Sequence, residues 1–392
     1  DQLAVCIVEG ADEFVATDLD EDIFLGIDVE RGGRFRGRYE DEALQVGVVS
    51  RFSPRRAIGR LYEGLQQRVV LRIMFDVLDH HPGIRRFNGT DHLFGVIFTT
   101  SFGFMDASEV VANEFPDVDI IHISGYKSNG ENFGNLMGAM ENMKYLAGML
   151  AGSRTKMDNN TKIGYIATFP IPEELRLGNA FALGVQQTCP DCTIDVRWIF
   201  TWHDPILEKE GASSLFDAGA QVVMTGADTP APADAAPEGK WGITYDYSGN
   251  CTSPKCLTSM YWNWGPEYAR IVEGSREGTW RGGWEYFDAD SGALGLFGFM
   301  EGETMQPGVA ELPAEDLALV QDTLAKMLAG EFTRFDVFKG PITDNQGNLV
   351  LADGVSLEQL DLDGFAQFGS ECTTCMYWWN QNITAELPDL ES

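Results

Sequence analysis

The sequence predicts an α/β protein in which strands and helices alternate, so that parallel sheets form with right-handed crossovers. Two observations support this fold class. From residue 94 onward, short apolar segments rich in β-branched residues alternate with amphipathic segments of helical period. The chain has 392 residues, which is more than one ordinary core supports, so two lobes are expected.

The first clear unit of this alternation is a buried strand over residues 96–99, followed by a helix over residues 107–115. Phe102, Gly103 and Phe104 lie in the turn between them. In an open α/β sheet, ligands sit at the carboxyl ends of the strands. The two rings are therefore candidate surfaces for a flat ligand, with Gly103 allowing close backbone approach. The alternative is that both aromatic residues belong to the core.

The preceding 92 residues are less regular. Short strands are expected over residues 3–9 and 44–50. A helix is expected over residues 55–67, with Ser53 as its N-cap and Pro54 in its first turn.

Basic residues are distributed unevenly over the chain. Twelve of the nineteen arginines lie between Arg31 and Arg86, whereas the first lysine is Lys127. A basic surface patch would explain this bias, and so would a shifted reading frame in this part of the sequence. The sequence leaves both explanations open.

The alternation continues through the middle and the end of the chain. Further strands are expected over residues 118–124, 162–167, 193–198, 222–225, 241–245 and 257–262. Helices are expected over residues 133–151, 171–187, 265–277 and 312–330, and from the turn at 201–205 to residue 218. Residues 282–299 are predicted to contain β structure, and residues 341–348 a hairpin turn.

Composition narrows the class of protein. The net charge of −32 disfavours binding to nucleic acid and to anionic lipid. No apolar run reaches the length of a membrane span. The chain starts at Asp1, which suggests a processed mature form. The sequons at Asn88, Asn159, Asn250 and Asn382 fit a protein outside the cytoplasm.

Six of the seven cysteines form close pairs, which are Cys189 with Cys192, Cys251 with Cys256, and Cys372 with Cys375. We interpret the pairs as disulfides with short loops in an oxidising compartment. A zinc site built from the two CxxC pairs is the alternative, although no histidine lies near any pair. Cys6 is expected to be a buried thiol.

Motifs for catalysis, cofactors and metals are missing from the sequence. There is no GxSxG elbow, no P-loop and no GxGxxG after a strand. The five histidines have no metal-ligand spacing. Residues 344–348 resemble a calcium loop, but the later glutamate that such a loop requires is missing. We therefore predict no enzyme activity, no cofactor and no metal.

Segments spread over residues 95–390 carry a resemblance to a known family, through their order and spacing. They are residues 97–106, 114–118, 124–127, 145–148, 164–166, 170–173, 179–184, 202–205, 217–220, 262–268, 278–280, 338–342 and 387–388. Together they resemble the basic membrane protein family, which comprises extracytoplasmic solute-binding proteins of ABC transporters for purine nucleosides and nucleobases.

The resemblance implies a type I periplasmic-binding fold, with two Rossmann-like lobes joined by a three-strand hinge. The first lobe would comprise residues 1–125 and 263–281, and the second residues 126–262 and 282–392. The protein would capture a purine nucleoside or nucleobase between the lobes, unaltered, and deliver it to an ABC permease. It would lie in the periplasm or at the cell surface, with or without a lipid anchor.

In a fold of this kind, several further side chains are candidate ligand contacts. Asp228 and Asp246 each follow a strand and would accept hydrogen bonds from ring N–H groups, exocyclic amines or ribose hydroxyls. Their alternative role is to cap the next turn. Asn179 offers a donor and an acceptor to a base edge, unless its helix turns it to solvent.

Aromatic residues complete the predicted site. Trp202 would form a second wall for the base, or else pack beneath a loop. Trp264 is a further candidate cleft residue. The resemblance favours Phe102 and Phe104 as stacking surfaces over the alternative that they belong to the core. The family's usual first strand carries a Gly/Asp-rich loop that ends in an aromatic residue, and residues 1–92 show no such loop.

Two functions of other classes remain as alternatives. One is an enzyme that acts on nucleosides, such as a hydrolase. The other is a structural or assembly role at the cell surface, suggested by the acidity, the sequons and the paired cysteines.

Overall fold

The computed structural model describes the backbone of residues 4–9, 13–18 and 23–28, and residues 95–100, 102–364 and 371–388 with their side chains. The chain divides into two compact units. Unit 1 comprises Asp1–Gly138 and Glu267–Tyr286, and unit 2 comprises Ala139–Pro266 and Phe287–Ser392. The chain therefore passes from one unit to the other three times.

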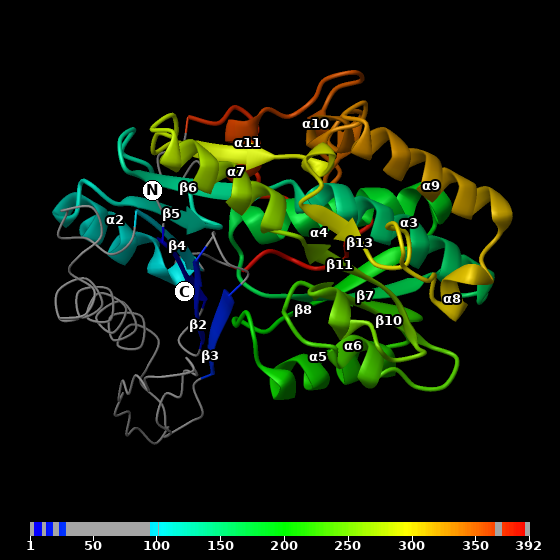
Figure 1. The fold of residues 1–392 in the computed structure, drawn as a ribbon. Helices are drawn as coiled ribbons and strands as arrows, with labels where there is room; N and C mark the ends of the chain where they lie inside the picture. Colours follow the sequence, from blue (N-terminus) through cyan, green and yellow to red (C-terminus); the bar gives the residue numbers. More distant parts are fainter. Residues whose placement is uncertain are drawn as a thin grey trace, which may run out of the picture. The chain divides into compact units, whose positions relative to one another are not determined.

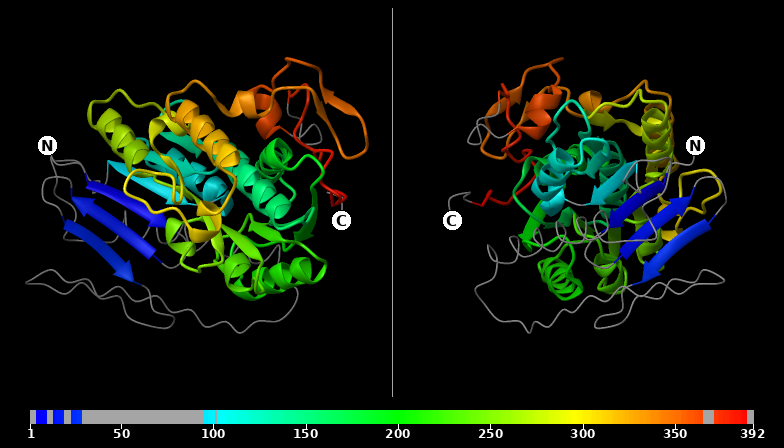
Figure 2. Two further views of the ribbon diagram at one scale, coloured as in Figure 1. Left: turned by 90° about the vertical axis from the view of Figure 1, so that its right-hand side faces the viewer. Right: turned by 60° about the vertical axis from the view of Figure 1, so that its left-hand side comes forward.

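Unit 1 is built on a seven-stranded sheet with the order β12-β6-β5-β4-β1-β2-β3. Its strands are β1 (Ala4–Glu9), β2 (Glu13–Asp18), β3 (Ile23–Asp28), β4 (Val96–Thr100), β5 (Asp119–Ile123), β6 (Phe133–Gly138) and β12 (Trp284–Phe287). Strands β1, β4, β5 and β6 pair in parallel, whereas β2 and β3 add an antiparallel edge. Figure 2 shows β1, β2 and β3 side by side in blue.

Short helices connect and cover the strands of unit 1. The 3-10 turn η1 (Phe102–Phe104) leads from β4 into α2 (Met105–Glu114), and α7 (Gly265–Arg276) enters the unit later in the chain. Val96 and Phe98 on β4 are fully buried, and the ring of Phe98 stacks on Tyr268 with centroids 4.2 Å apart. The continuous apolar strand is thus buried on both faces, as its sequence predicts.

Unit 2 contains a six-stranded sheet with the order β13-β11-β10-β9-β7-β8. Its strands are β7 (Lys162–Ala167), β8 (Thr193–Trp198), β9 (Val222–Thr225), β10 (Trp241–Asp246), β11 (Cys256–Trp262) and β13 (Leu294–Leu296). All neighbouring pairs are parallel except β11 with β13.

Helices cover both faces of this sheet, as Figure 1 shows. Helices α3 (Met140–Met157) and α4 (Pro172–Thr188) lie together on one face, and α5 (Pro205–Asp217) and α6 (Ala231–Asp234) lie on the other. This is the doubly wound arrangement that alternating strands and helices favour.

The rest of unit 2 is formed by the long helix α9, by several short elements and by the C-terminal segment. They are η2 (Ser248–Asn250), η3 (Ala289–Ser291), α8 (Pro307–Ala310), α9 (Ala314–Leu328), α10 (Arg334–Val337), β14 (Ile342–Thr343), β15 (Leu349–Leu351) and α11 (Gln359–Asp363). Ile383 then bridges in parallel to Ile194, so the C-terminal segment covers the free edge of β8.

The helix expected over residues 133–151 is wrong in its first part. Residues 133–138 form β6, and the helix begins only at Met140. A Cβ on Gly134 would lie 2.6 Å from the carbonyl oxygen of Gly283, so the residue suits a close strand contact rather than a helix. Because β6 pairs with β5, the first segment of unit 1 runs to Gly138, whereas the expected lobe boundary was at residue 125. The elements expected over residues 44–50 and 55–67, and the arginines from Arg31 to Arg86, lie outside the described residues.

The structure joins each close pair of cysteines as a disulfide: Cys189–Cys192, Cys251–Cys256 and Cys372–Cys375. These sulfurs are bonded to one another, so the two CxxC pairs do not offer the four thiolates that the zinc alternative needs. The side chain of Cys6 lies outside the described residues.

Candidate ligand-binding site

Two aspartates lie side by side at the carboxyl edge of the six-stranded sheet. Asp246 is the last residue of β10, and Asp228 follows the end of β9 by three residues. Strands β9 and β10 pair in parallel, so their carboxyl ends are neighbours. This is the edge at which open α/β sheets bind ligands.

Electrostatics couples the two aspartates. Burial and, after it, the negative charges of Asp246 and Glu208 raise the pKa of Asp228 to about 8. At neutral pH Asp228 therefore keeps its proton for most of the time, and the pair can present a hydrogen-bond donor beside an acceptor. Asp246 has a φ of +73°, a left-handed conformation that non-glycine residues adopt rarely and that is often found at functional sites.

A buried lysine supplies positive charge beneath this edge. Lys144 of α3 is fully buried, and its ammonium group donates to the carbonyl oxygen of Thr225 at 3.0 Å. The same group lies 3.8 Å from the ring centroid of Tyr245. Burial lowers the pKa of Lys144 to about 8, and the charges of Glu174 and Asp228 oppose that shift.

The first turn of α4 brings two further carboxylates to the end of β7. Glu174 is buried and accepts hydrogen bonds from the hydroxyls of Thr168, at 2.5 Å, and of Tyr165. Glu173 is half-buried, and burial raises its pKa to about 7. Glu174 is thus held by protein groups, whereas Glu173 lies closer to the surface.

An aromatic pair flanks the carboxylates. Trp202 follows β8 and packs against Phe169 with ring centroids 5.2 Å apart and an interplanar angle of 52°. Both rings are half-buried. The backbone N–H of Asp228 donates to the carbonyl oxygen of Trp202 at 3.1 Å, so the two loops are joined. The structure thereby brings Trp202 and Asp228 together, as the sequence-based hypothesis needs.

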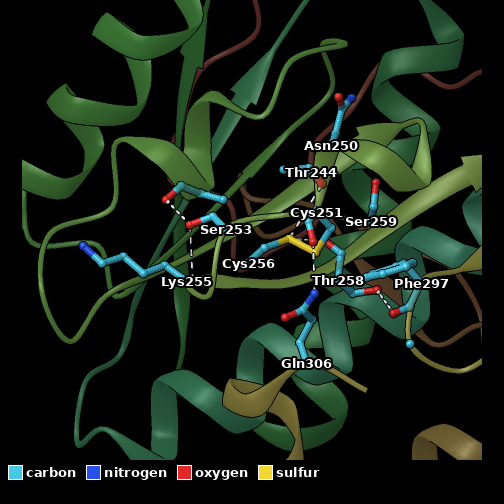
Figure 3. Close-up of a disulfide and its surroundings, with 12 residues drawn as sticks. Thr244, Asn250, Cys251, Ser253, Lys255, Cys256, Thr258, Ser259, Phe297 and Gln306 are labelled. Carbon is cyan, nitrogen blue, oxygen red and sulfur yellow. Dashed lines mark hydrogen bonds between the residues drawn. A yellow bond between two sulfur atoms is a disulfide. The ribbon is translucent and has the colours of Figure 1, made fainter. Parts of the chain in front are cut away.

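Asn250 and a disulfide fix the loops around the aspartates. The side-chain amide of Asn250 donates to the carbonyl oxygens of Asp228 and Tyr245, each at 3.0 Å. Figure 3 shows Asn250 next to the Cys251–Cys256 disulfide, which closes the loop between β10 and β11. Gln306 donates to the carbonyl oxygen of Cys251 at 3.0 Å. These bonds give the edge a defined shape.

Trp264 also lies beyond the carboxyl end of a strand, here β11. Its ring stacks on Trp262 with centroids 4.5 Å apart, and Phe287 contacts both rings edge-on. Trp264 is half-buried. It is thus part of a packed aromatic cluster that still presents some surface.

The predicted aromatic turn of unit 1 lies where expected, at the carboxyl end of β4. Phe102 is half-buried and Gly103 is exposed. A Cβ on Gly103 would meet no atom within 4 Å, so the backbone there is open to approach. Phe104 is only 8% exposed and belongs to the core of unit 1, which is the alternative role that the sequence left open.

Asn179 has a structural role in place of the predicted one. It is fully buried in α4, and its amide nitrogen donates to the carbonyl oxygen of Trp378 at 2.8 Å. Its amide oxygen accepts from the backbone N–H of Asn380 at 2.8 Å. Both ends of the amide are therefore used to hold the C-terminal segment, which leaves nothing for a base edge.

Sequence reasoning missed several buried groups of this edge, namely Lys144, Tyr165, Glu174 and Tyr245. Lys144 stands between Met143 and Tyr145 in a helix that is otherwise largely apolar. A lysine within the apolar part of a helix, here residues 143–152, is a usable signal, because such a residue is buried only with partners. Those partners come from strands far along the chain, which no local pattern reveals.

Two open hollows of about 430 and 380 Å³ lie elsewhere, at the opposite edge of the unit 1 sheet. Asp119, which begins β5, lines one of them, and Trp280 and Arg281 line both. The smaller hollow lies at the amino ends of β5 and β6, and the larger is lined by α7, the segment after it and β12; neither lies at the carboxyl ends of strands, where open α/β sheets bind their ligands. We therefore place the candidate site at the carboxyl edge instead.

Two α/β units with largely parallel sheets, linked by three passages of the chain, define a type I solute-binding fold. A solved ABC transporter solute-binding protein from Aeropyrum pernix K1 has this fold, with a TM-score of 0.54 and 18% identity over 70% of this chain and 80% of that one. The profile of PnrA-like ABC transporter substrate-binding proteins matches residues 87–326. The chain belongs to this family, which confirms the resemblance.

Two relatives differ in the ligand that their names state. A purine-binding protein of Brucella abortus is 30% identical over 274 residues, which are 69% of this chain and 73% of that protein. An ABC transporter glucose-binding protein of Haloferax volcanii is 40% identical over 187 residues. That match spans only 47% of either chain, so about half the length of this relative is covered.

Family membership carries three statements of a general kind. Members are substrate-binding proteins, they act outside the cytoplasm, and they take a small-molecule ligand to an ABC permease. No helix in the described part of the chain is long and apolar enough to cross a membrane.

Proposed function

We propose that the protein captures a purine nucleoside or nucleobase, leaves it chemically unaltered and delivers it to an ABC permease. The single observation that carries this proposal is the pair Asp228 and Asp246 on neighbouring strand ends, flanked by the rings of Trp202 and Phe169. The name of the Brucella relative supports the same class of ligand. Periplasmic release or a lipid anchor at the cell surface both fit this role.

The chemistry of the edge suits a purine. A flat heterocycle can stack on Trp202, because every base offers an aromatic face. An ionised carboxylate accepts hydrogen bonds from ring N–H groups, exocyclic amines or ribose hydroxyls, and a protonated one donates to a ring nitrogen. A ligand without matching groups would leave a half-buried carboxyl unpaired, which costs about 1–3 kcal/mol and gives specificity.

Further contacts are part of the proposal. We assign Trp264 after β11 and Phe102 with Gly103 after β4 as additional contact residues. Each follows a strand that belongs to a parallel pair; Trp264 and Phe102 are half-buried, and the backbone at Gly103 is open to approach. Phe104 and Asn179 are left out because the protein itself uses their side chains.

A second candidate ligand is a sugar. The Haloferax relative is named for glucose binding and has the higher identity over its shorter match. Carboxylates also accept from sugar hydroxyls, and a tryptophan face packs against the C–H groups of a pyranose ring. The same edge would therefore serve, with Trp202 as the platform and Asp228 and Asp246 as acceptors.

Isothermal titration calorimetry with ligand-free protein separates the two candidates. The panel is adenine, adenosine, guanosine and inosine against glucose and other hexoses. We expect heat with at least one purine and none with the sugars. Strong heat with glucose and none with any purine would replace the first proposal by the second. Chromatography of inosine after incubation should show no free base; its release would mean a nucleoside-acting enzyme.

A further inference from the structure

Three of the four sequons lie in the described part of the chain, at Asn159, Asn250 and Asn382. Transfer of a glycan to such a site needs an amide nitrogen that is free to react and a surface position with room for a sugar. The sequence alone makes the three sites equivalent. Their surroundings in the fold make them different.

Asn382 and Asn250 use their amide nitrogens inside the protein. Asn382 is 7% exposed, and its amide donates to the carbonyl oxygen of Ala182 at 3.0 Å. Asn250 donates to two carbonyl oxygens that hold the loops after β9 and β10. A sugar on either nitrogen would break these bonds and would have to enter packed protein.

Asn159 differs from the other two asparagines in its exposure and in its hydrogen bonding. It is exposed, and in the described part of the chain its side-chain amide has no hydrogen-bond partner. Thr161, the hydroxyl residue of this sequon, is also exposed. The hydroxyl and the amide that a glycan-transferring enzyme must reach are therefore both on the surface.

The way in which α3 ends explains why the side chain of Asn159 makes no hydrogen bond. The backbone φ of Asn159 is +55°. Its backbone N–H donates to the carbonyl oxygen of Lys156, and the N–H of Asn160 donates to the carbonyl oxygen of Thr155. This is a Schellman motif, which closes a helix with a left-handed residue. Asparagine tolerates that conformation, so the fold needs its backbone but makes no bond to its side chain.

Position favours modification as well. Asn159 and Thr161 immediately precede Lys162, the first residue of β7, so the sequon lies at the amino edge of the six-stranded sheet. Asp228 and Asp246 lie at the carboxyl edge. A glycan at Asn159 therefore leaves the candidate ligand-binding site open.

We propose that Asn159 is N-glycosylated and that Asn250 and Asn382 are not. The family acts outside the cytoplasm, where glycans carried on lipid phosphates are the donors. The amide nitrogen of Asn159 forms a bond to C1 of the donor sugar as the bond from C1 to the phosphate oxygen breaks. The lipid phosphate leaves with that electron pair, and the amide proton passes to a base of the transferring enzyme.

Mass spectrometry of the protein made in its own host tests the proposal. After reduction and trypsin digestion, the sequons fall in separate peptides, residues 157–162, 241–255 and 340–392. We expect a sugar mass on the first peptide only. An unmodified first peptide, or a glycan on either of the other two, would overturn the assignment.

Two variants show that the mass belongs to this sequon. Asn159→Gly keeps the left-handed residue that ends α3, since glycine is the usual residue there. Thr161→Ala keeps Asn159 itself. We expect both variants to fold, by circular dichroism, and to lose the added mass entirely. Added mass that persists in Thr161→Ala would show another modification and refute the proposal.

Discussion

The carboxyl of Asp228 shows how burial and like charge act together on one side chain. Burial raises its pKa first, and the charges of Asp246 and Glu208 raise it further. The parallel pairing of β9 and β10 brings the two aspartates to one edge. A protonated and an ionised carboxyl side by side can form hydrogen bonds with a ligand that carries an acceptor next to a donor.

Removing the charge of Asp246 should therefore lower the pKa of Asp228 below its value of about 8. Asp246→Asn is suitable because asparagine tolerates the positive φ. The pKa is measured by NMR titration of the aspartate carboxyl carbons in ligand-free protein. Asp191→Asn, an exposed position, is the matched control. An unchanged Asp228 titration in Asp246→Asn would contradict the coupling.

Asn179 illustrates a polar residue whose function is internal. Asn179→Ala would leave the carbonyl oxygen of Trp378 and the backbone N–H of Asn380 without their partner. We expect a loss of about 2–3 kcal/mol in the free energy of unfolding, measured by urea denaturation. Gln187→Ala, at an exposed position of the same helix, should cost less than about 0.5 kcal/mol. Ligand affinity should stay the same in both variants, and a selective loss in Asn179→Ala would restore Asn179 as a ligand contact.

At the scale of elements, the crossing of α3 and α4 organises unit 2. Gly148 of α3 and Gly184 of α4 let the two backbones approach closely. A Cβ on Gly184 would lie 1.9 Å from the carbonyl oxygen of Tyr145, and one on Gly148 would lie 2.1 Å from that of Phe181. Such contacts cannot be relieved by a side-chain rotation, because backbone atoms make them.

Gly184→Ala should destabilise the protein, although alanine is the better helix former. The two helices would have to move apart, which should cost about 3 kcal/mol of unfolding free energy. Gly211→Ala in α5 is the control, because its Cβ would meet no atom closer than 3.6 Å. That variant should gain about 0.5–1 kcal/mol from helix propensity. Thermal denaturation of Gly184→Ala and Gly211→Ala measures both effects. Equal stabilities of the two variants would refute the close crossing of α3 and α4.

At the scale of the whole chain, a continuous path of polar contacts, which runs from Glu141 to its chain neighbour Asn142, ties distant segments of unit 2 together. Its members are Glu141, Asn142, Arg176, Asp288, Arg334, Gln359 and Asp363. Two of its positions lie next to chain passages between the units: Glu141 two residues after Ala139, and Asp288 directly after Phe287. The path therefore anchors the ends of two connecting segments within unit 2.

Glu141 makes this path sensitive to pH. Burial raises its pKa from 4.5 to about 7, and the charge of Arg176 opposes the shift. A raised pKa means that the folded state holds the proton more tightly. The contribution to stability is therefore full below pH 4.5 and is lost as the pH rises through 7, on the order of 3 kcal/mol in total.

Glu141→Gln should remove this dependence, because glutamine mimics the protonated form. The difference in unfolding free energy between the variant and the wild type should shift in favour of the variant as the pH rises from 5 to 8. Urea denaturation at each pH measures it. Glu210→Gln, at an exposed position of α5, should keep the wild-type profile. A parallel profile for Glu141→Gln would show that Glu141 is ionised throughout.

The type and order of most elements from residue 96 onward are determined locally. The apolar strands β4 and β7, and the helix α4 with Pro172 and acidic residues in its first turn, carry their signals within a few residues. The resemblance across residues 95–390 likewise depends only on order and spacing, and the matching family profile confirms it. The placement of Asp228 and Asp246 after strands follows from the same local reading.

Tertiary structure decides which side chains remain available. Nothing within a few residues of Asn179 shows that Trp378 and Asn380 take up its amide, or that Phe104 is core while Phe102 keeps exposed surface. Lys144 becomes part of the ligand edge only because β9 and β10 pack against its helix. Burial and hydrogen-bond partners come from segments far apart in the chain. Local sequence therefore determines the strands and their ends, and packing determines which of those ends can receive a ligand.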